Sequence, residues 1–370
     1  MLTSNPRRVT LRDIAAELDV SAKTVSNAYR HPDQLSAGLR ERVLATAARL
    51  GFVGPDPLGS GLRRGHVGAI GVAYANRLSY AFEDPVTVEL LAGITSGAEN
   101  AGAGLMLLSG SATPESRVSS LTAAAIDGLI VNSLAEDDPL LPVAIARRLP
   151  LSVIDQPEPA ALRRLGAPDS PWVGIDDHAA ASAVADHLLS LGHRRLAVVS
   201  FGLHRAPTRS LVDERGQEAA TYAVTRRRLA GYRDAAVRAG VAWAHVPVVQ
   251  GTDSTPADGE AGAEIALAAR PRPTALLCLS DRLAEGALRA AARHGLRVPE
   301  DLSIAGLDDA PPAAALGLTT VRQPNRRKGQ LAVAALLVQL GGSPAGLPTT
   351  LPTELIVRRS TGPAPAPSSA

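Results

Sequence analysis

The sequence of 370 residues is poor in lysine, with only Lys23 and Lys328 among its 38 basic residues, and it contains a single cysteine. One cysteine excludes an internal disulfide, and we expect Cys278, in the apolar run TALLCLS, to be a buried thiol rather than a nucleophile. No apolar run reaches the roughly 18 residues that a membrane-spanning helix needs. The N-terminal segment MLTSNPRRVT lacks the apolar stretch of a secretory signal. These absences favour a cytoplasmic protein with no membrane segment.

Motifs of common cofactor-dependent and hydrolytic enzymes are also missing. The sequence has no G-x-x-x-x-G-K-[ST], H-E-x-x-H or G-x-S-x-G, and GHVGAIGV lacks the spacing of a dinucleotide-binding loop. We therefore expect no cofactor and no metal. We expect His193, in LGHRR, to be a capping or structural residue rather than a catalyst.

The charged residues are unevenly distributed. Residues 1–64 contain ten Lys/Arg and six Asp/Glu, whereas the remaining chain contains 28 and 30, although the net charge of the whole chain is only +2. A small basic head on a slightly acidic body favours binding of a polyanion by the head.

The basic head has the pattern of three short helices. In TLRDIAAELDV, residues 10–20, apolar residues recur at helical spacing and Thr10 is in position to cap the N-terminus. Ser21 can cap a second helix, AKTVSNAYR, which His31-Pro32 ends, and a third helix begins near Ser36. Two short helices joined by a tight turn, with a third closing the core, form a helix-turn-helix unit.

The second helix of such a unit lies in the DNA major groove. If Val25 and Ala28 face the core, the exposed face comprises Ala22, Lys23, Ser26 and Asn27. Lysine suits the acceptors of guanine and asparagine suits adenine, while Ser21 and Thr24 can hydrogen-bond phosphates. The alternative is a solvated helix face that carries one lysine.

The segment GFVGPDPLGSGLRRG, residues 51–65, follows the head. Asp56 and Pro57 favour the start of a helix, but Gly59 and Gly61 each disfavour its propagation by roughly 1 kcal/mol. The segment is therefore either a plain linker or a hinge that becomes helical only on a partner.

From residue 67 onward, apolar strand-like runs alternate with helix-like segments, which is the βαβ rhythm of doubly wound parallel sheets. About 270 residues are enough for two such lobes. Ligands of open α/β sheets bind at the carboxyl ends of the strands. The strand runs are VGAIGVAY, GLMLLS, GLIVNS, LSVID, WVGID, RLAVVS, VPVVQ, TALLCLS and LSIAGLDD.

Polar and aromatic residues near these strand ends are candidates for a ligand site. ANRLSYAFEDP offers Tyr80, Phe82 and Asp84, and an aromatic beside a carboxylate suits a sugar with an apolar ring face and a hydroxylated rim. The alternative is a surface loop with a buried phenylalanine. Arg228 opens RLAGYRDAA, Asp308 ends LSIAGLDD and Gln323 ends LTTVRQ; taken singly, each is better explained as a solvated or capping residue.

These segments together resemble the lac repressor (LacI/GalR) family of transcription regulators. The resemblance covers residues 8 to 360 and is carried by VTLRDIAAELDVSAKTVSNAYR, the GPDP…L hinge, HLLSLGHRRLAVVS, RLAGYRDA, LSDRLAEGALRAAARHGLRVPEDLSIAGLDD and LTTVRQP. It implies base-reading positions at Ala22, Lys23 and Asn27 and a minor-groove wedge at Leu62. It also implies effector contacts from Arg228, Asp308 and Gln323, with Phe82 and Asp84 in the first pocket loop. This chain departs from the family at Gly38-Leu39, at Gly59-Ser60-Gly61 and at Ser280.

The sequence therefore predicts an all-α helix-turn-helix head at 8–50, a hinge at 51–65, a two-lobed α/β effector-binding and dimerisation body at 66–360, and a disordered tail at 361–370. We expect a non-enzymatic repressor, either a homodimer or a tetramer, that binds operator DNA and a small sugar-like effector. The predicted DNA-binding residues are Thr10, Ser21, Ala22, Lys23, Thr24, Asn27 and Leu62. A two-lobed solute-binding protein and a doubly wound enzyme without DNA function remain the alternatives.

Overall fold

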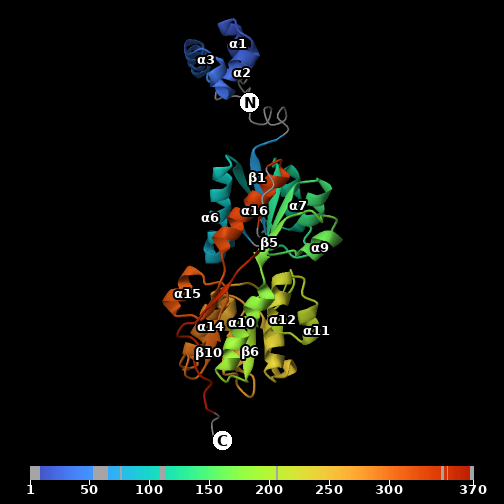
Figure 1. The fold of residues 1–370 in the computed structure, drawn as a ribbon, viewed down its shortest axis with the longest axis vertical. Coiled ribbons are helices and arrows are strands. Elements are labelled where there is room, and N and C mark those ends of the chain that lie inside the picture. Colours follow the sequence, from blue (N-terminus) through green and yellow to red (C-terminus); the bar gives the residue numbers. More distant parts are fainter. Residues whose placement is uncertain are drawn as a thin grey trace, which may run out of the picture. The chain divides into compact units, whose positions relative to one another are not determined.

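The computed structural model describes residues 9–52, 66–75, 77–108, 113–205, 207–342, 346–347 and 349–366. The chain divides into two compact units, Met1–Gly68 and Ala69–Ala370 (Figure 1). Most of the predicted hinge, including Leu62, lies outside the described residues.

The first unit contains the predicted three helices. Its core is formed by buried apolar side chains: Ile14, Ala15, Val25, Ala28, Val43 and Ala47. Each helix begins where a hydroxyl side chain accepts a hydrogen bond from the backbone N–H three residues later, as helix caps do. The caps are Thr10, Ser21 and Ser36, and the elements are α1 (Leu11–Leu18), α2 (Ala22–Arg30), the 3₁₀ turn η1 (Pro32–Gln34) and α3 (Ala37–Arg49).

The first lobe of the second unit is built on a parallel sheet with the strand order β12-β5-β4-β3-β1-β2. Its strands are β1 (Ala69–Tyr74), β2 (Gly104–Leu108), β3 (Gly128–Asn132), β4 (Leu151–Ile154), β5 (Trp172–Ile175) and β12 (Thr350–Leu351). Its helices are α5 (Leu78–Glu83), α6 (Pro85–Asn100), α7 (Pro114–Ala123), α8 (Leu140–Ala146), α9 (Pro159–Arg164) and α16 (Asn325–Gln339).

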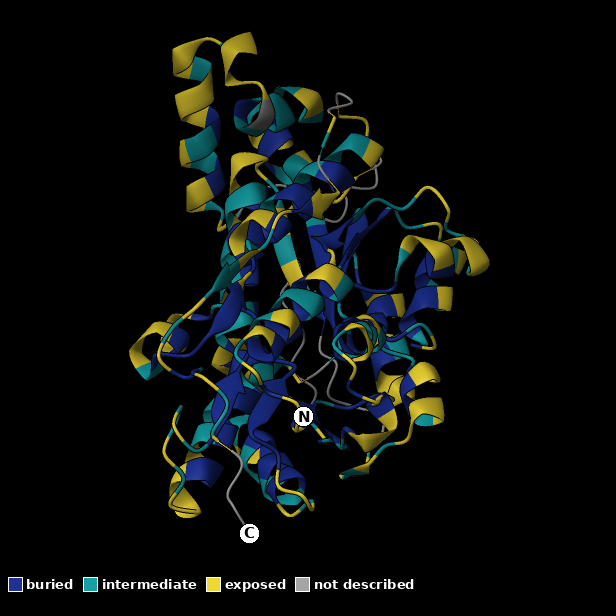
Figure 2. Cartoon of the chain, turned by 60° about the horizontal axis from the view of Figure 1, so that its bottom comes forward, coloured by how far each residue is buried: buried dark blue, intermediate teal, exposed yellow. Residues whose placement is uncertain are grey.

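Alternate residues of these strands enter two different cores, as expected for a sheet covered on both faces. Ile130 of β3 packs into a cluster with residues of α6 and α16, whereas its neighbours Leu129 and Val131 pack into a cluster with residues of α7, α8 and α9. The near-continuous apolar runs in the sequence are explained by this double coverage (Figure 2).

The second lobe has a sheet with the order β10-β9-β6-β8-β7. Its strands are β6 (Leu196–Ser200), β7 (Ser210–Leu211), β8 (Val248–Gln250), β9 (Ala275–Cys278) and β10 (Ser303–Ala305). Its helices are α10 (Asp177–Ser190), α11 (Glu214–Glu218), α12 (Ala223–Arg238), η2 (Trp243–His245), α13 (Pro256–Leu267), α14 (Asp281–Arg293) and α15 (Pro311–Leu316). A separate antiparallel pair joins β11 (Thr320–Arg322) to β13 (Glu354–Ile356).

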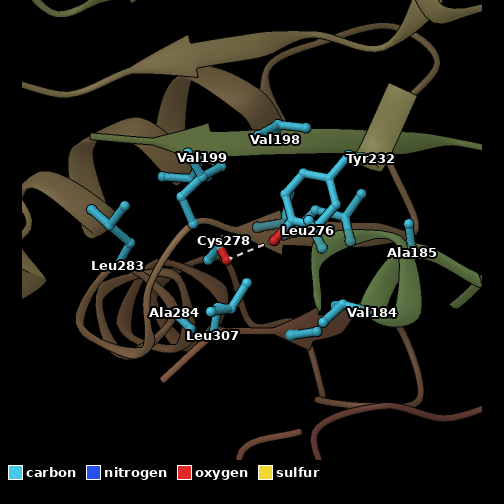
Figure 3. Packing of buried hydrophobic residues seen from close by; sticks show 14 of the residues in the cluster. Val184, Ala185, Val198, Val199, Tyr232, Leu276, Cys278, Leu283, Ala284 and Leu307 are labelled. Atoms are coloured by element: carbon cyan, nitrogen blue, oxygen red, sulfur yellow. Dashed lines mark hydrogen bonds between the residues drawn. The ribbon is translucent and has the colours of Figure 1, made fainter. Parts of the chain in front are cut away.

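Cys278 and His193 both lie in the interior of the second lobe. Cys278 is fully buried among apolar side chains, and burial raises the pKa of its thiol far above the ordinary range (Figure 3). His193 is also fully buried, and its ring nitrogens are 2.9 Å from Thr274 Oγ1 and 3.0 Å from Gly362 O. Both positions agree with structural roles.

The chain crosses between the lobes after β5, after β11 and after β12. As a result α16, near the C-terminus, packs along α6 in the first lobe (Figure 1). The end of the chain then returns to the second lobe, where the Gly362 amide donates to Ser303 Oγ at 3.1 Å and the Ala364 amide donates to Leu191 O at 2.8 Å. The predicted disorder from residue 361 is therefore wrong for residues 361–364, because their backbone is paired with the second lobe.

Among the helices that the structure describes, none is both long enough and apolar enough to cross a membrane.

Candidate functional site

The second helix of the head, α2, presents one clearly exposed residue of the predicted base-reading set. Lys23 is exposed, whereas Ala22, Ser26 and Asn27 are half-buried. Ala22 packs against the head core. Asn27 donates a 3.2 Å hydrogen bond from Nδ2 to Gln34 Oε1 in η1. The predicted exposure is thus correct for Lys23 only, because α2 is rotated so that its flanks also contact α1, α3 and η1.

The other predicted DNA-binding residues of the head take part in local hydrogen bonds. Thr10 and Asp13 form a capping box, in which the Thr10 amide donates to Asp13 Oδ2 at 2.7 Å. Ser21 caps α2, and its hydroxyl lies 2.8 Å from Thr24 Oγ1. These side chains fix the start of each helix, so any phosphate contact they make comes in addition to that local role.

A cavity of about 250 Å³ lies between the two lobes of the second unit, at the carboxyl ends of their strands. The strands deliver Tyr74 and Asn132 from the first lobe, and Ser280 and Asp308 from the second. This is where the sequence predicts a ligand. Four of the five predicted effector residues line the cavity: Asp84, Arg228, Asp308 and Gln323 do so, and Phe82 does not.

Phe82 is 62% exposed and does not line the cavity, so the prediction for it is wrong. The segment folds as the short helix α5 rather than as a loop, and residues two positions apart on a helix face different directions. Tyr80 lines the cavity instead, and its hydroxyl donates a 2.9 Å hydrogen bond to Ser254 O in the second lobe. Asp84 caps α6 by accepting from the Thr87 amide at 3.1 Å.

Arg228 is a buried cation between two carboxylates. Its Nε donates to Asp177 Oδ1 at 2.7 Å, and its Nη1 lies 3.7 Å from Asp308 Oδ1. Burial alone would favour the neutral guanidine, but these carboxylates raise the pKa of Arg228 above its ordinary value. Burial raises the pKa of both Asp177 and Asp308, which the arginine opposes. The cavity therefore offers a fixed cation beside carboxylate acceptors.

Two residues on successive turns of α12 donate hydrogen bonds to neighbouring backbone carbonyls. Arg228 Nη1 donates to the carbonyl of Leu279, and Tyr232, four residues later, donates from its hydroxyl to the carbonyl of Cys278 at 3.1 Å (Figure 3). Both carbonyls belong to the end of β9. The guanidinium is thus anchored to the sheet edge where a ligand would bind.

Asp308 occupies an unusual backbone conformation, with φ of +141°. Its amide donates to Val321 O at 2.9 Å, and Gln323 Nε2 donates to its Oδ1 at 2.7 Å. A strained backbone persists only where the surrounding structure holds it, and such residues are concentrated at functional sites.

Ion pairs also join the two lobes directly. Glu136 and Glu158 of the first lobe accept from α12 of the second: Arg226 Nη2 lies 3.0 Å from Glu136 Oε1, and Arg227 Nε lies 2.7 Å from Glu158 Oε1. These pairs are partly exposed, so each contributes little alone.

Sequence reasoning named Tyr80 among the aromatics of its segment but missed Asp155 and Asp177. Asp155 lines the cavity directly after β4, where φ is +62°. It ends the run LSVID, so the rule that polar residues after strands form the site would have found it. Asp177 lies behind Arg228, and no sequence pattern indicates that pairing.

Comparison with known proteins shows which family has this fold. The model of the periplasmic binding protein-like domain matches residues 185–361. The HTH-type transcriptional regulator Rv3575c of Mycobacterium tuberculosis is 42% identical over 362 residues, covering 96% of this chain and 98% of that relative. The chain belongs to the LacI family of transcriptional regulators.

Solved structures of LacI-family members agree with this assignment. The lac repressor dimer bound to operator and the anti-inducer ONPF matches with a TM-score of 0.75 and 26% identity, covering 96% of this chain and all of that chain. The CelR–cellobiose complex matches with a TM-score of 0.67 and 26% identity, covering 95% and 100%. The predicted family, two-lobed fold and regulatory rather than enzymatic function are thereby confirmed.

Proposed function

We propose that this LacI-family regulator is a cytoplasmic homodimeric repressor that binds operator DNA through α2 and responds to a small neutral sugar-like effector in the interlobe cavity. The observation that carries the proposal is the convergence of Arg228, Asp308 and Gln323 on that cavity. The lac repressor, a relative in fold, is a dimer bound to operator.

The lining chemistry supports a hydroxyl-rich effector. Carboxylates such as Asp155 and Asp308 accept hydrogen bonds from hydroxyls, and Arg228 can donate to them. The aromatic rings of Tyr80, Phe201 and Tyr222 also line the cavity and suit the apolar face of a sugar ring. The related CelR binds cellobiose.

On the DNA side, we propose that Lys23 and Asn27 contact base edges, with Ala22 close to them, and that Thr10, Ser21 and Thr24 lie near phosphates. Leu62, outside the described residues, is proposed as the minor-groove wedge. Two heads in a symmetric dimer would read a pseudo-palindrome. The effector shifts operator affinity only as far as its affinities for the two lobe arrangements differ.

The test begins with selection of operator sequences by the purified full-length protein, followed by fluorescence anisotropy at several salt concentrations. We expect a dimer by ultracentrifugation, a preferred pseudo-palindrome, and an affinity that falls steeply with salt. The protein–operator complex is then titrated with ribose, glucose, cellobiose and related neutral sugars. A protein with no sequence preference, or one whose operator affinity no neutral sugar changes, would contradict the proposal.

A further inference from the structure

The only lysine of the two-lobed unit is buried. Lys328 lies on α16 with 1% of its surface exposed, whereas its neighbours Arg326 and Arg327 are exposed. Its ammonium donates hydrogen bonds of 2.6 Å to Asp155 Oδ1 and 2.7 Å to Gln323 Oε1. A buried ammonium requires such partners, because an unpaired charge in the interior is very costly. Both partners line the cavity, and Lys328 stands directly behind them.

The backbone that carries Lys328 is held by a close helix crossing. A Cβ atom on Gly329 would lie 2.4 Å from Leu90 O, and a Cβ on Gly93 would lie 2.0 Å from Arg326 O. Only glycine permits α6 and α16 to approach so closely. The backbone at Lys328 is therefore fixed relative to the first lobe, and its two hydrogen bonds hold the ammonium in place.

Lys328 determines the orientation of the Gln323 amide. Because the amide oxygen faces the ammonium, the amide nitrogen faces Asp308, to whose Oδ1 it donates at 2.7 Å. A reversed amide would set NH₂ against the ammonium and a carbonyl oxygen against the carboxylate, which is unfavourable at both ends. The lysine charge thus fixes which group Gln323 presents to Asp308.

An ion pair and a further hydrogen bond extend this series into the second lobe. Beyond Gln323, Asp308 lies 3.7 Å from Arg228, which in turn donates to Asp177 at 2.7 Å. Asp155 and Lys328 belong to the first lobe, while Asp308, Arg228 and Asp177 belong to the second. This series of polar contacts, from Lys328 to Asp177, therefore runs from one lobe to the other along the wall of the cavity.

We propose that Lys328 is a positioning residue of the effector site, which sets Asp155 and Gln323 in place and couples the first lobe to the Asp308–Arg228 pair of the second. The proposal rests on the proposed effector function of the cavity. A lysine that served only the stability of α16 would influence its own helix and the end of β4. A coupling lysine must also influence residues 303–311, which belong to the second lobe.

Hydrogen exchange of the full-length protein, measured by mass spectrometry, separates these roles. Lys328→Met removes the ammonium while keeping a long side chain, and Arg327→Met is the matched control on the exposed face of the same helix. Gln323→Met breaks the next link without removing the Lys328–Asp155 pair, so it remains informative if Lys328→Met fails to fold. The double variant tests whether the two links act in series.

We expect Lys328→Met and Gln323→Met each to raise exchange of the 303–311 segment by about tenfold, which corresponds to the loss of roughly one buried hydrogen bond. Arg327→Met should leave it unchanged, and the double variant should exceed neither single variant appreciably. In protein labelled with ¹⁵N-lysine, which has only two side-chain signals, Gln323→Met should shift the Lys328 ammonium resonance and leave that of Lys23 in place.

Faster exchange confined to α16 and the end of β4, or additive effects in the double variant, would overturn the coupling role. If Lys328→Met does not fold, an unchanged 303–311 segment in Gln323→Met would overturn it equally. These experiments use no effector. Absence of any sugar response would therefore refute the proposed function without changing the exchange result.

Discussion

Tyr80 in the first lobe and Ser254 in the second are joined by a 2.9 Å hydrogen bond from the tyrosine hydroxyl to the serine carbonyl. The guanidinium of Arg282 lies 5.5 Å from the centre of the same tyrosine ring, and its Nη1 donates to Glu83 O at 2.6 Å. One side of the cleft is therefore bridged by neighbouring contacts from α5.

Tyr80→Phe should remove the bridge while keeping the ring beside Arg282. We expect the unfolding free energy of the two-lobed unit to fall by about 1 kcal/mol, the net value of one such hydrogen bond. Chemical denaturation of the full-length protein measures this. Phe82→Ala, two residues away and exposed, should change it by less than about 0.5 kcal/mol and leave sugar binding intact. A clear loss of sugar affinity in Phe82→Ala would show that this residue belongs to the site.

Arg228→Ala should abolish the effector response and destabilise the fold. It leaves Asp177 and Asp308 buried without their cation, for which about 3–5 kcal/mol is the usual penalty. Arg227→Ala is the control, because Arg227 is half-exposed and pairs with Glu158. Calorimetry with a sugar that releases operator, together with denaturation, tests both variants. Equal sugar affinity in Arg228→Ala and the parent protein would refute the assignment.

The head allows stability and recognition to be separated. Ser21→Ala removes the cap of α2 and should lower the stability of the head by about 1 kcal/mol. Lys23→Ala removes an exposed side chain, so it should leave the stability of the head unchanged. It should weaken binding to the selected operator by about 1–3 kcal/mol and reduce the preference for one particular base. Thermal unfolding and anisotropy on operator and random DNA distinguish the two. Equal losses on both DNAs would make Lys23 a phosphate contact only.

Asp308 and Gln323 follow β10 and β11, so the rule that ligands bind at strand ends points to them, whereas Arg228 lies inside α12. The resemblance to the family, rather than that rule, assigned all three to the effector site. Helix caps in the head were predictable from the sequence itself, since hydroxyl residues preceded each apolar pattern. Phe82 was not, because the choice between two aromatics depends on how a short helix is rotated. The contact of Lys328 with Asp155 joins residues 173 positions apart, and no local pattern records it.

Asp281 should make stability depend on pH. Burial raises its pKa to about 6, although hydrogen bonds from Thr320 and the Ala310 amide lower it. In the unfolded chain the pKa is about 3.9, so between these values the native state binds more protons, and this group's contribution to stability declines as pH rises from about 4 to about 6.

Asp281→Asn removes that titration, while its amide oxygen can accept from the Ala310 amide and its NH₂ can donate to Thr320 Oγ1. Between pH 4.5 and 7, the parent protein should therefore lose up to about 2 kcal/mol more stability than the variant. Asp301→Asn is the control of opposite sign. Arg297 lowers the pKa of Asp301 to about 2, so its contribution is lost only below about pH 4. Parallel pH profiles for Asp281→Asn and the parent would contradict this prediction.

The packing of α16 against the first lobe has a consequence for synthesis on the ribosome. Ile70, Val72 and Ile130 share a core with Val333 and Leu336 of α16, which lie more than 200 residues later than β3 or β1. Helix α6 of the same cluster is made early, but at roughly 5–20 residues per second its partner α16 follows on the order of ten seconds or more later. Through that interval one face of the sheet is only partly covered, and apolar side chains of the nascent chain stay exposed. The first lobe therefore completes its folding only when synthesis is nearly finished.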